Sequence, residues 1–152
     1  MVDTPALQEL NGSELEFEVV TYSRANSVEE GAAKQAIAPS ALIKTLVIRR
    51  GEGDYVFVLV PGDREMDWPK LRGHLGVTRI SMPDAAEAFE ASGYERGTIT
   101  PFGAKTRWPV LADSSMTGTV SIGGGAHGVA IHLDSTALLA YLDAETADIT
   151  SL

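Results

Sequence analysis

The stretch ALIKTLVIRRGEGDYVFVLVP, residues 41–61, decides the fold class. It holds two runs rich in β-branched and aromatic residues, 42–50 and 54–61, and each has the length of a strand. The segment Gly51-Glu52-Gly53 between them predicts a tight hairpin connection. The second run is almost wholly apolar, which is typical of a central strand covered on both faces.

Helix signals flank this hairpin on both sides. Ser27 and Glu30 have the spacing of a capping box and predict a helix to about residue 36. Asp67 can cap a helix to residue 75, with Pro69 tolerated in its first turn. Because strands and helices mingle without strict βαβ alternation, we expect a mixed-sheet α/β or α+β domain. Further helices are expected at 5–10, 83–91 and 135–142, further strands at 15–19, 78–81, 110–112, 117–122 and 128–133, and a short acidic tail at the end.

Length and composition indicate one globular domain spanning residues 1–152. The chain is 44% hydrophobic and 22% charged, both ordinary for a soluble protein. It has no cysteine, which excludes a disulfide framework, a thiolate zinc site and a cysteine nucleophile. Residues 1–10 do not read as a signal peptide, and no apolar run approaches the ~20 residues of a membrane span. We therefore expect a cytoplasmic protein without a membrane partner.

The charge of the chain is unevenly distributed. The net charge of −9 argues against tight, unspecific binding to a phosphate backbone, so DNA is not an expected partner and tRNA affinity should be weak. Ten of the twelve basic residues nevertheless lie between Lys44 and Arg107. The folded chain could present one basic face on an acidic body, or these charges could simply be solvated at the surface.

Several runs in order along the chain carry a family resemblance: 41–47 (ALIKTLV), 61–64 (PGDR), 70–76 (KLRGHLG), 93–103 (GYERGTITPFG), the turn Gly123-Gly124-Gly125 and the strand 128–133. From about residue 17 to 142 the chain resembles the YbaK family, also called the prolyl-tRNA synthetase-associated or aminoacyl-tRNA editing domain. The resemblance implies a mixed, barrel-like β-sheet flanked by helices. It also implies hydrolysis, without a metal or other cofactor, of the ester that joins a noncognate amino acid to the terminal adenosine of tRNA.

Lys44 is the first candidate for the site. It lies in an apolar run and shares one strand face with Leu42 and Leu46, where an ammonium is costly unless it reaches water or an anion. A lysine whose stem lies on the core while its ammonium reaches solvent would also fit this pattern. The resemblance places Lys44 on the signature lysine of the family and implies that it holds the phosphate or ribose of the terminal adenosine.

The long segment 93–109 is the second candidate, since loops of this length without regular structure are often functional. Gly97 and Pro101 match the Gly-x-x-x-Pro loop of the family, although an ordinary turn would have the same residues. Backbone N–H groups aimed at the oxyanion of ester hydrolysis stabilise it, glycine permits their close approach, and proline stiffens the loop. Neighbouring residues of the motif are further substrate-binding candidates: Thr100, Phe102 and Gly103.

Other substrate-binding candidates lie outside this loop. Tyr22 matches an aromatic residue near the family's site and would stack on adenine or pack on the core. His127 follows the glycine turn, in a region where the related insertion domains carry a histidine that helps to bind the aminoacyl group. A solvated turn histidine is the alternative. Gly124 and Gly125 form a turn or bulge that would border the pocket.

The sequence contains no motif of a covalent hydrolase. Ser114, Ser115 and Ser121 are not part of a Gly-x-Ser-x-Gly elbow. Three dispersed histidines without a carboxylate at ligand spacing do not predict a zinc site. The resemblance then implies direct attack by water, positioned by the 97–101 loop and Lys44, and helped by the vicinal ribose hydroxyl of the tRNA.

We therefore expect a deacylase that removes wrongly attached amino acids from tRNA in trans. A non-catalytic module that only binds aminoacyl-tRNA, and a hydrolase of small esters unrelated to tRNA, are the alternatives. A partner synthetase could deliver the substrate, or recognition could rest on the aminoacyl-adenosine end. The sequence does not identify the amino acid removed. Candidate contacts to the tRNA acceptor end are Arg49, Arg50, Lys70, Arg72, Lys105 and Arg107.

Overall fold

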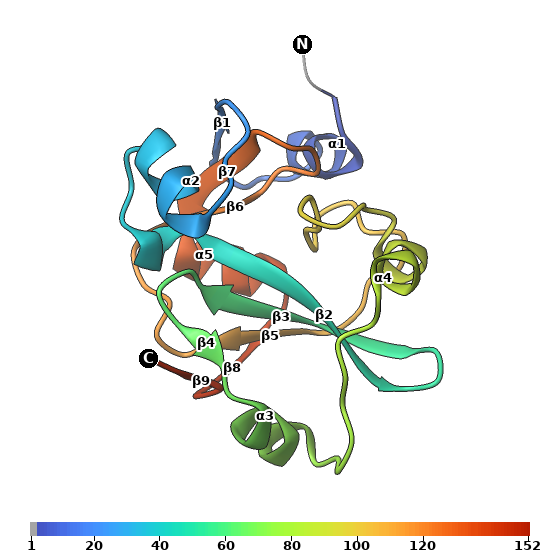
Figure 1. Ribbon diagram of the computed structural model, residues 1–152. Helices are drawn as coiled ribbons and strands as arrows, with labels where there is room; N and C mark the ends of the chain where they lie inside the picture. The colour runs from blue at the N-terminus through green and yellow to red at the C-terminus, as the bar shows by residue number, and fades with distance from the viewer. Residues whose placement is uncertain (1–2) are drawn as a thin grey trace.

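Strands β2 (Ile43–Gly51) and β3 (Asp54–Pro61) form the predicted antiparallel hairpin, drawn from cyan to green in Figure 1. The computed structural model describes residues 3–152. β3 also pairs in parallel with β5 (Val110–Asp113), which pairs in parallel with β8 (Glu145–Ala147). The resulting four-stranded mixed sheet has the order β2-β3-β5-β8, so β3 is internal, as its apolar sequence predicts.

A second sheet is antiparallel and lies against the start of β2. Its order is β1-β7-β6, with β1 at Glu18–Thr21, β6 at Thr119–Gly123 and β7 at Val129–Asp134. A bridge between Leu42 and Ser121 joins the two sheets. No sheet in the described part of the chain closes on itself. The mixed α/β class is thus confirmed, with open sheets that meet at β2.

Within residues 3–152, five α-helices and one short 3-10 helix flank these sheets (Figure 1). The two side-chain caps predicted from the sequence, at Ser27 and Asp67, are present. Ser27 accepts from the N–H of Glu30 at 3.0 Å, and the Glu30 carboxylate accepts from the N–H of Asn26 at 3.0 Å. Asp67 accepts from the N–H of Lys70 at 3.1 Å. The helices are α1 (Pro5–Asn11), α2 (Val28–Lys34), η1 (Pro39–Ala41), α3 (Trp68–Leu75), α4 (Ala85–Ser92) and α5 (Ser135–Tyr141).

Three expectations about strands differ from the structure. The strand expected at 15–19 begins only at Glu18, because the preceding residues pack on the core without a ladder partner. The strand expected at 78–81 is reduced to one bridge, between Arg49 and Ser81. The short acidic tail, for which no strand was expected, contains β8 and also β9 (Thr150–Ser151), which pairs with β4 (Glu65–Met66).

The apolar core lies on both faces of the mixed sheet. Phe57 and Leu59 of β3 belong to one cluster, whereas Val56, Val58 and Val60 belong to the other. This alternation is the two-residue period of a strand whose two faces are both covered. No helix within residues 3–152 is long and apolar enough to cross a membrane.

Candidate functional site

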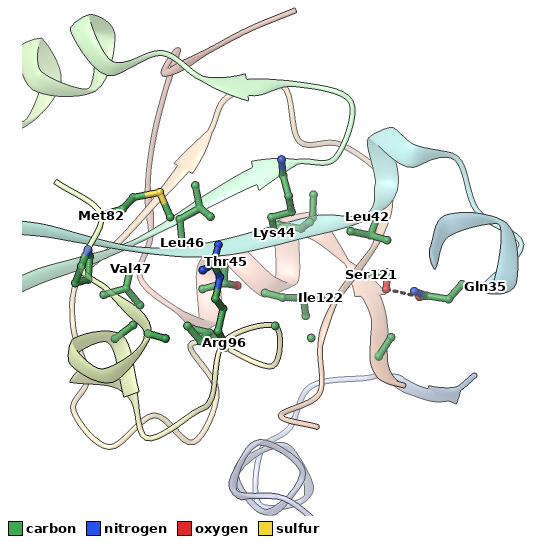
Figure 2. A pocket seen from close by; sticks show the side chains of 18 of the residues that line it. Gln35, Leu42, Lys44, Thr45, Leu46, Val47, Met82, Arg96, Ser121 and Ile122 are labelled. Atoms are coloured by element: carbon green, nitrogen blue, oxygen red, sulfur yellow. Dashed lines mark hydrogen bonds between the residues drawn. The ribbon is translucent and has the colours of Figure 1, made fainter. Parts of the chain in front are cut away.

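A cavity of about 540 Å³ runs along β2 (Figure 2). One wall is formed by Leu42 and the first half of β2, as far as Val47, and no residue of β3 lines the cavity. The other walls come from β6, from the start of the predicted loop around Gly97, and from the segment before and within α4. The volume lies in the usual range of small-molecule sites, ~300–1,000 Å³.

Lys44 and Gly97 both line this cavity, although they are distant in sequence. In Figure 2 the side chain of Lys44 leaves β2 on the side opposite to Arg96. The pleat explains this direction, because Lys44 and Leu46 share one face of the strand while Thr45 is on the other. Among residues 3–152 no carboxylate pairs with the Lys44 ammonium, so it is available to an anion.

The outer edge of β2 exposes backbone hydrogen-bonding groups to the cavity. The N–H and C=O of Arg49 both bond to Ser81, at 2.8 and 3.1 Å, on the side away from β3. Since amide directions alternate along an antiparallel strand, Thr45 and Val47 point the same way as Arg49. Among residues 3–152, β2 has no ladder partner on this side between its bridges at Leu42 and Arg49. The edge can therefore donate to and accept from a bound molecule.

The hydroxyl of Thr45 is the second unusual polar group of this wall. Within residues 3–152, Thr45 Oγ1 is the one buried side-chain oxygen or nitrogen without a hydrogen-bond partner. A buried polar atom left unpaired costs roughly 1–3 kcal/mol. A ligand in the cavity can satisfy this oxygen, so Thr45 is a candidate contact that the sequence did not reveal.

Gly97 needs the backbone freedom of glycine. Its φ of +92° lies in the region that side chains rarely adopt, and an added Cβ would approach His127 Cε1 to 3.0 Å. His127 in turn contacts Glu95, with Nε2 and Oε1 at 2.9 Å. His127 therefore lies against the back of the loop and is not among the residues that line the cavity.

The remaining motif residues of the loop point into the protein. Thr100 and Phe102 are fully buried, and the ring of Phe102 packs against Tyr141 with centroids 5.7 Å apart. Pro101 is also buried and lines a different cavity. Gly103, with a φ of +65°, lies against the first turn of α1 so closely that a Cβ would collide with it. These four residues pack against the protein around the loop, and none of them lines the cavity around Lys44.

The glycine turn has a comparable packing role. An added Cβ at Gly124 would meet Val129 Cγ1 at 2.6 Å, and one at Gly125 would meet Tyr94 Cε1 at 3.0 Å. Gly123 is the member of this turn that lines the cavity. The absence of side chains thus lets β6 and β7 approach their neighbours closely.

A hydrogen-bonded group forms another part of the wall. The Ser121 hydroxyl donates to Gln35 Oε1 at 2.6 Å, drawn as the dashed line in Figure 2. Nε2 of His132 lies 2.8 Å from the same oxygen, and because an amide oxygen only accepts, this nitrogen carries the hydrogen. Tyr22 also lines the cavity, and burial raises the pKa of its phenol, which therefore stays protonated at neutral pH.

The charged side chains of the wall are both cations. Lys44 and Arg96 line the cavity, and no Asp, Glu or His is among the lining residues. Neither cation has an ion-pair partner in the described chain. Arg96 was not predicted, although its place directly before the motif glycine could have suggested it. Nowhere in residues 3–152 do three or more His, Cys, Asp or Glu gather in a group that could hold a metal ion.

The family model for the aminoacyl-tRNA editing domain matches residues 22–141. The chain belongs to this family. The matched span contains β2, the loop with Gly97 and the turn with His127, and every residue that lines the cavity lies within it. The family resemblance found in the sequence is confirmed.

Named relatives of this editing domain are of two kinds. It is 27% identical over 127 residues to "Putative Cys-tRNA(Pro)/Cys-tRNA(Cys) deacylase EbsC" of Enterococcus faecalis, covering 82% of this chain and 77% of that protein. It is 31% identical over 123 residues to a proline–tRNA ligase of Geotalea daltonii, covering 81% of this chain but 21% of the ligase. The chain thus spans a small part of the ligases that it matches.

Solved structures share the fold of this editing domain. A protein described as "a putative trans-editing enzyme for prolyl tRNA synthetase" superposes with a TM-score of 0.84 at 22% identity, covering 99% of this chain and 100% of that one. A hypothetical protein reaches a TM-score of 0.89 at 20% identity, with 97% and 100% covered. At these identities the likeness concerns the fold.

Proposed function

We propose that this editing domain is a deacylase that acts in trans on mischarged tRNA, as a single domain in the cytoplasm. The observation that supports it best is the cavity in which Lys44, the edge of β2 and the loop at Gly97 come together. Its two unpaired cations suit an anionic nucleotide, and its apolar remainder suits the side chain of an amino acid.

In the proposed complex the terminal adenosine of tRNA enters this cavity. Lys44 and Arg96 hold its phosphate and ribose. Amides of the 97–101 loop stabilise the oxyanion, a role for which preorganised N–H donors are effective. A contact to the outward amides of Thr45 and Val47 would fix the aminoacyl group.

The reaction is a hydrolysis of the aminoacyl ester. Water attacks the ester carbonyl carbon, the bond from that carbon to the ribose oxygen breaks, and a proton of the water passes to the departing oxygen. The products are the free amino acid and tRNA with both terminal hydroxyls restored. No carboxylate or imidazole lines the cavity, so the vicinal ribose hydroxyl of the substrate is the group we assign to assist the water. We propose that no metal takes part.

A covalent route through Ser121 has little support. Its hydroxyl donates to an amide oxygen, which is too weak a base to activate it. The buried motif residues of the loop would act by holding its position: Thr100, Pro101, Phe102 and Gly103. His127 would support Gly97 through contact on the side of the loop away from the cavity. These roles are indirect, in contrast to the contacts assigned to Lys44.

The relatives suggest which substrates to test. Because the names of two of them refer to tRNA(Pro), we propose tRNA(Pro) carrying cysteine or another small amino acid as the first substrate, and a prolyl-tRNA synthetase as the partner that could deliver it. Pocket shape separates neighbouring amino acids by only ~1–3 kcal/mol per methylene, so a panel is required.

The test is a deacylation panel with tRNAs charged with cysteine, alanine, serine, threonine and proline. We expect turnover of at least one, and a fall of about 10- to 100-fold in Lys44→Ala, since a charged hydrogen bond contributes about 1.5–3 kcal/mol. Arg24→Ala is the matched control, because Arg24 is exposed and lines none of the cavities described.

Two outcomes would contradict the proposal. Binding of aminoacyl-tRNA without turnover of any substrate would favour a non-catalytic module. Equal activity of wild type and Lys44→Ala would remove Lys44 from the site. The assisting hydroxyl is tested separately with tRNA that ends in deoxyadenosine next to the ester, which should resist hydrolysis.

A further inference from the structure

Another cavity, of about 410 Å³ and separate from the one that Pro101 lines, is lined by four arginines. Arg49 and Arg50 come from the end of β2, Arg72 from α3, and Arg79 from the segment that follows α3. The rest of the lining is uncharged. A hollow surrounded by guanidinium groups is unexpected in a chain with a net charge of −9.

The four guanidinium groups are not equivalent. Arg49 lies 3.5 Å from Glu87, and Arg50 lies 2.8 Å from Asp54, so both have acidic partners. Arg72 and Arg79 form no ion pair with any residue of the described chain. Their charges are therefore uncompensated and available to an external anion.

The distribution of unpaired cations singles out two places on the molecule. Six of the twelve lysines and arginines form ion pairs, which leaves six without one among residues 3–152. Two of these six line the editing cavity and two line the arginine hollow. Only Arg24 and Lys105 lie outside both. Uncompensated positive charge thus coincides with the two hollows.

The two hollows are neighbours on the same strand. Val47 lines the first and Arg49 the second, so the two hollows adjoin on β2. Lys44, beside which the terminal adenosine is placed, is five residues from Arg49, which is about 17 Å of extended chain at ~3.4 Å each. The segment beside β2 also runs from one to the other, because Ser81 lines the arginine hollow and Met82 lines the editing cavity. A strand of RNA that leaves the editing cavity along β2 would pass the arginines about five nucleotides later, at ~3.4 Å per stacked nucleotide.

We propose that the arginine hollow binds the phosphate backbone of the tRNA acceptor end, near the start of the acceptor helix. This rests on the proposed function, which places the terminal adenosine next to Lys44. Guanidinium groups match phosphate oxygens with paired N–H donors, and arginine is the preferred residue for this contact. Arg72 and Arg79, which have no acidic partner, make the direct contacts, while Arg49 and Arg50 add to the local potential.

The first experiment measures binding of uncharged tRNA by fluorescence anisotropy over a range of salt concentrations. The variant is Arg72→Gln/Arg79→Gln, which removes two charges and retains most of each stem. The control is Arg24→Gln/Lys34→Gln, which changes the net charge equally at two exposed cations outside the hollows. We expect Kd to rise about tenfold or more in the variant, and the slope of log Kd against log salt to fall by about 1.5, as expected for two lost phosphate contacts.

The second experiment compares substrates of two lengths. A short aminoacylated trinucleotide does not reach the hollow, so its kcat/KM should be equal in wild type and variant. The kcat/KM of full-length mischarged tRNA should fall about tenfold, mainly through KM. Unfolding curves, and the single change Arg79→Gln at an exposed side chain, separate a binding effect from a folding defect.

Several results would overturn the inference. The first is an equal loss of tRNA binding in variant and control, which would indicate only general charge. The second is an equal loss of activity on both substrate lengths. The third is unchanged tRNA binding with lost binding to a purified prolyl-tRNA synthetase, which would assign the hollow to a protein partner. Failure of wild type to deacylate any substrate would overturn the proposed function. The anisotropy experiment would still test whether the arginine hollow binds tRNA.

Discussion

Thr45 and Lys44 are adjacent on β2 but contribute to the cavity in different ways. Lys44 offers a charge from one face of the strand, and Thr45 offers a buried hydroxyl from the other. A group that forms no hydrogen bond in the folded chain can be removed without destabilising it. Replacing the Thr45 hydroxyl therefore tests its role in substrate binding without a loss of folding stability.

Thr45→Val tests that separation. The change replaces an unpaired hydroxyl by a methyl group of similar shape, so the free energy of unfolding should stay equal or rise by up to about 1 kcal/mol. Loss of a contact to the substrate should lower kcat/KM about fivefold to tenfold. Thr45→Ser keeps the hydroxyl and should retain activity. Urea unfolding and deacylation kinetics provide the two readouts, and full activity of Thr45→Val would assign the hydroxyl no role.

Gly97→Ala tests the backbone of the loop. The φ of +92° and the 3.0 Å approach to His127 predict a loss of about 1–2 kcal/mol in stability. Because the amides of the loop would shift, deacylation should fall by much more than stability alone explains. Gly73→Ala is the control, since a Cβ there meets nothing within 4 Å in α3 and should stabilise the helix by about 0.5–1 kcal/mol. Normal activity of folded Gly97→Ala would show that the loop amides tolerate displacement.

At the scale of elements, patterns within one segment were predictable and pairings between distant segments were not. The hairpin of β2 and β3 and the caps at Ser27 and Asp67 follow from local rules of spacing. The strands β8 and β9 are short, and their pairing with β5 and β4 is set by tertiary packing. For the same reason the motif indicated Lys44 and Gly97, whereas Thr45 became a candidate only through its surroundings.

The loop after α4 is held to α1 by one carboxylate. Glu9 accepts from the N–H of Gly103 at 2.8 Å and from the hydroxyl of Tyr141 at 2.7 Å, and it pairs with Arg107 at 3.1 Å. A second contact is the hydroxyl of Tyr94, which donates to the carbonyl of Phe102 at 2.6 Å. Burial raises the pKa of this hydroxyl to about 12. The loop is therefore fixed at its far end, away from Gly97.

Glu9→Ala should release that far end. We expect a loss of about 1–3 kcal/mol in the free energy of unfolding, because several donors lose a charged acceptor. Hydrogen exchange at the amide of Gly103 should accelerate, and deacylation should fall moderately as the loop loses its position. Glu14→Ala, at an exposed position, is the control. Unchanged exchange at Gly103 would mean that other contacts suffice to hold the loop.

At the scale of the whole molecule, half of the twelve lysines and arginines pair with acids, and most of the unpaired ones line the two hollows beside β2. Of the six residues expected at the tRNA, Lys70 pairs with Asp148 and Arg107 with Glu9, while Lys105 lines none of the cavities described. Arg49, Arg50 and Arg72 meet in one hollow together with Arg79, which the sequence did not single out. Net charge is a sum over the chain, so it could not reveal that unpaired cations gather beside the cavity.

Asp113 connects the end of β5 to the C-terminal strand, and its ionisation should set part of the acid stability. Its carboxylate accepts from the N–H of Ile149 at 3.1 Å and lies 3.7 Å from Arg64. Burial alone would raise the pKa of Asp113, but hydrogen bonds from Ser115, Ile149 and Thr150 outweigh it and lower the pKa below its usual value.

A lowered pKa in the folded state stabilises the fold at every pH above the unfolded value of about 3.9, and this contribution disappears as the pH falls through the folded pKa. Asp113→Asn should therefore cost about 1–3 kcal/mol at pH 7, because one amide oxygen replaces a carboxylate that serves several donors. The difference between wild type and variant should shrink below about pH 4, as wild type itself becomes protonated. Urea unfolding between pH 3 and 7 measures this, with Asp63→Asn at an exposed turn as the control. A difference that stays constant over this range would mean that the amide disturbs packing and that the charge of Asp113 is not what stabilises the C-terminal strand.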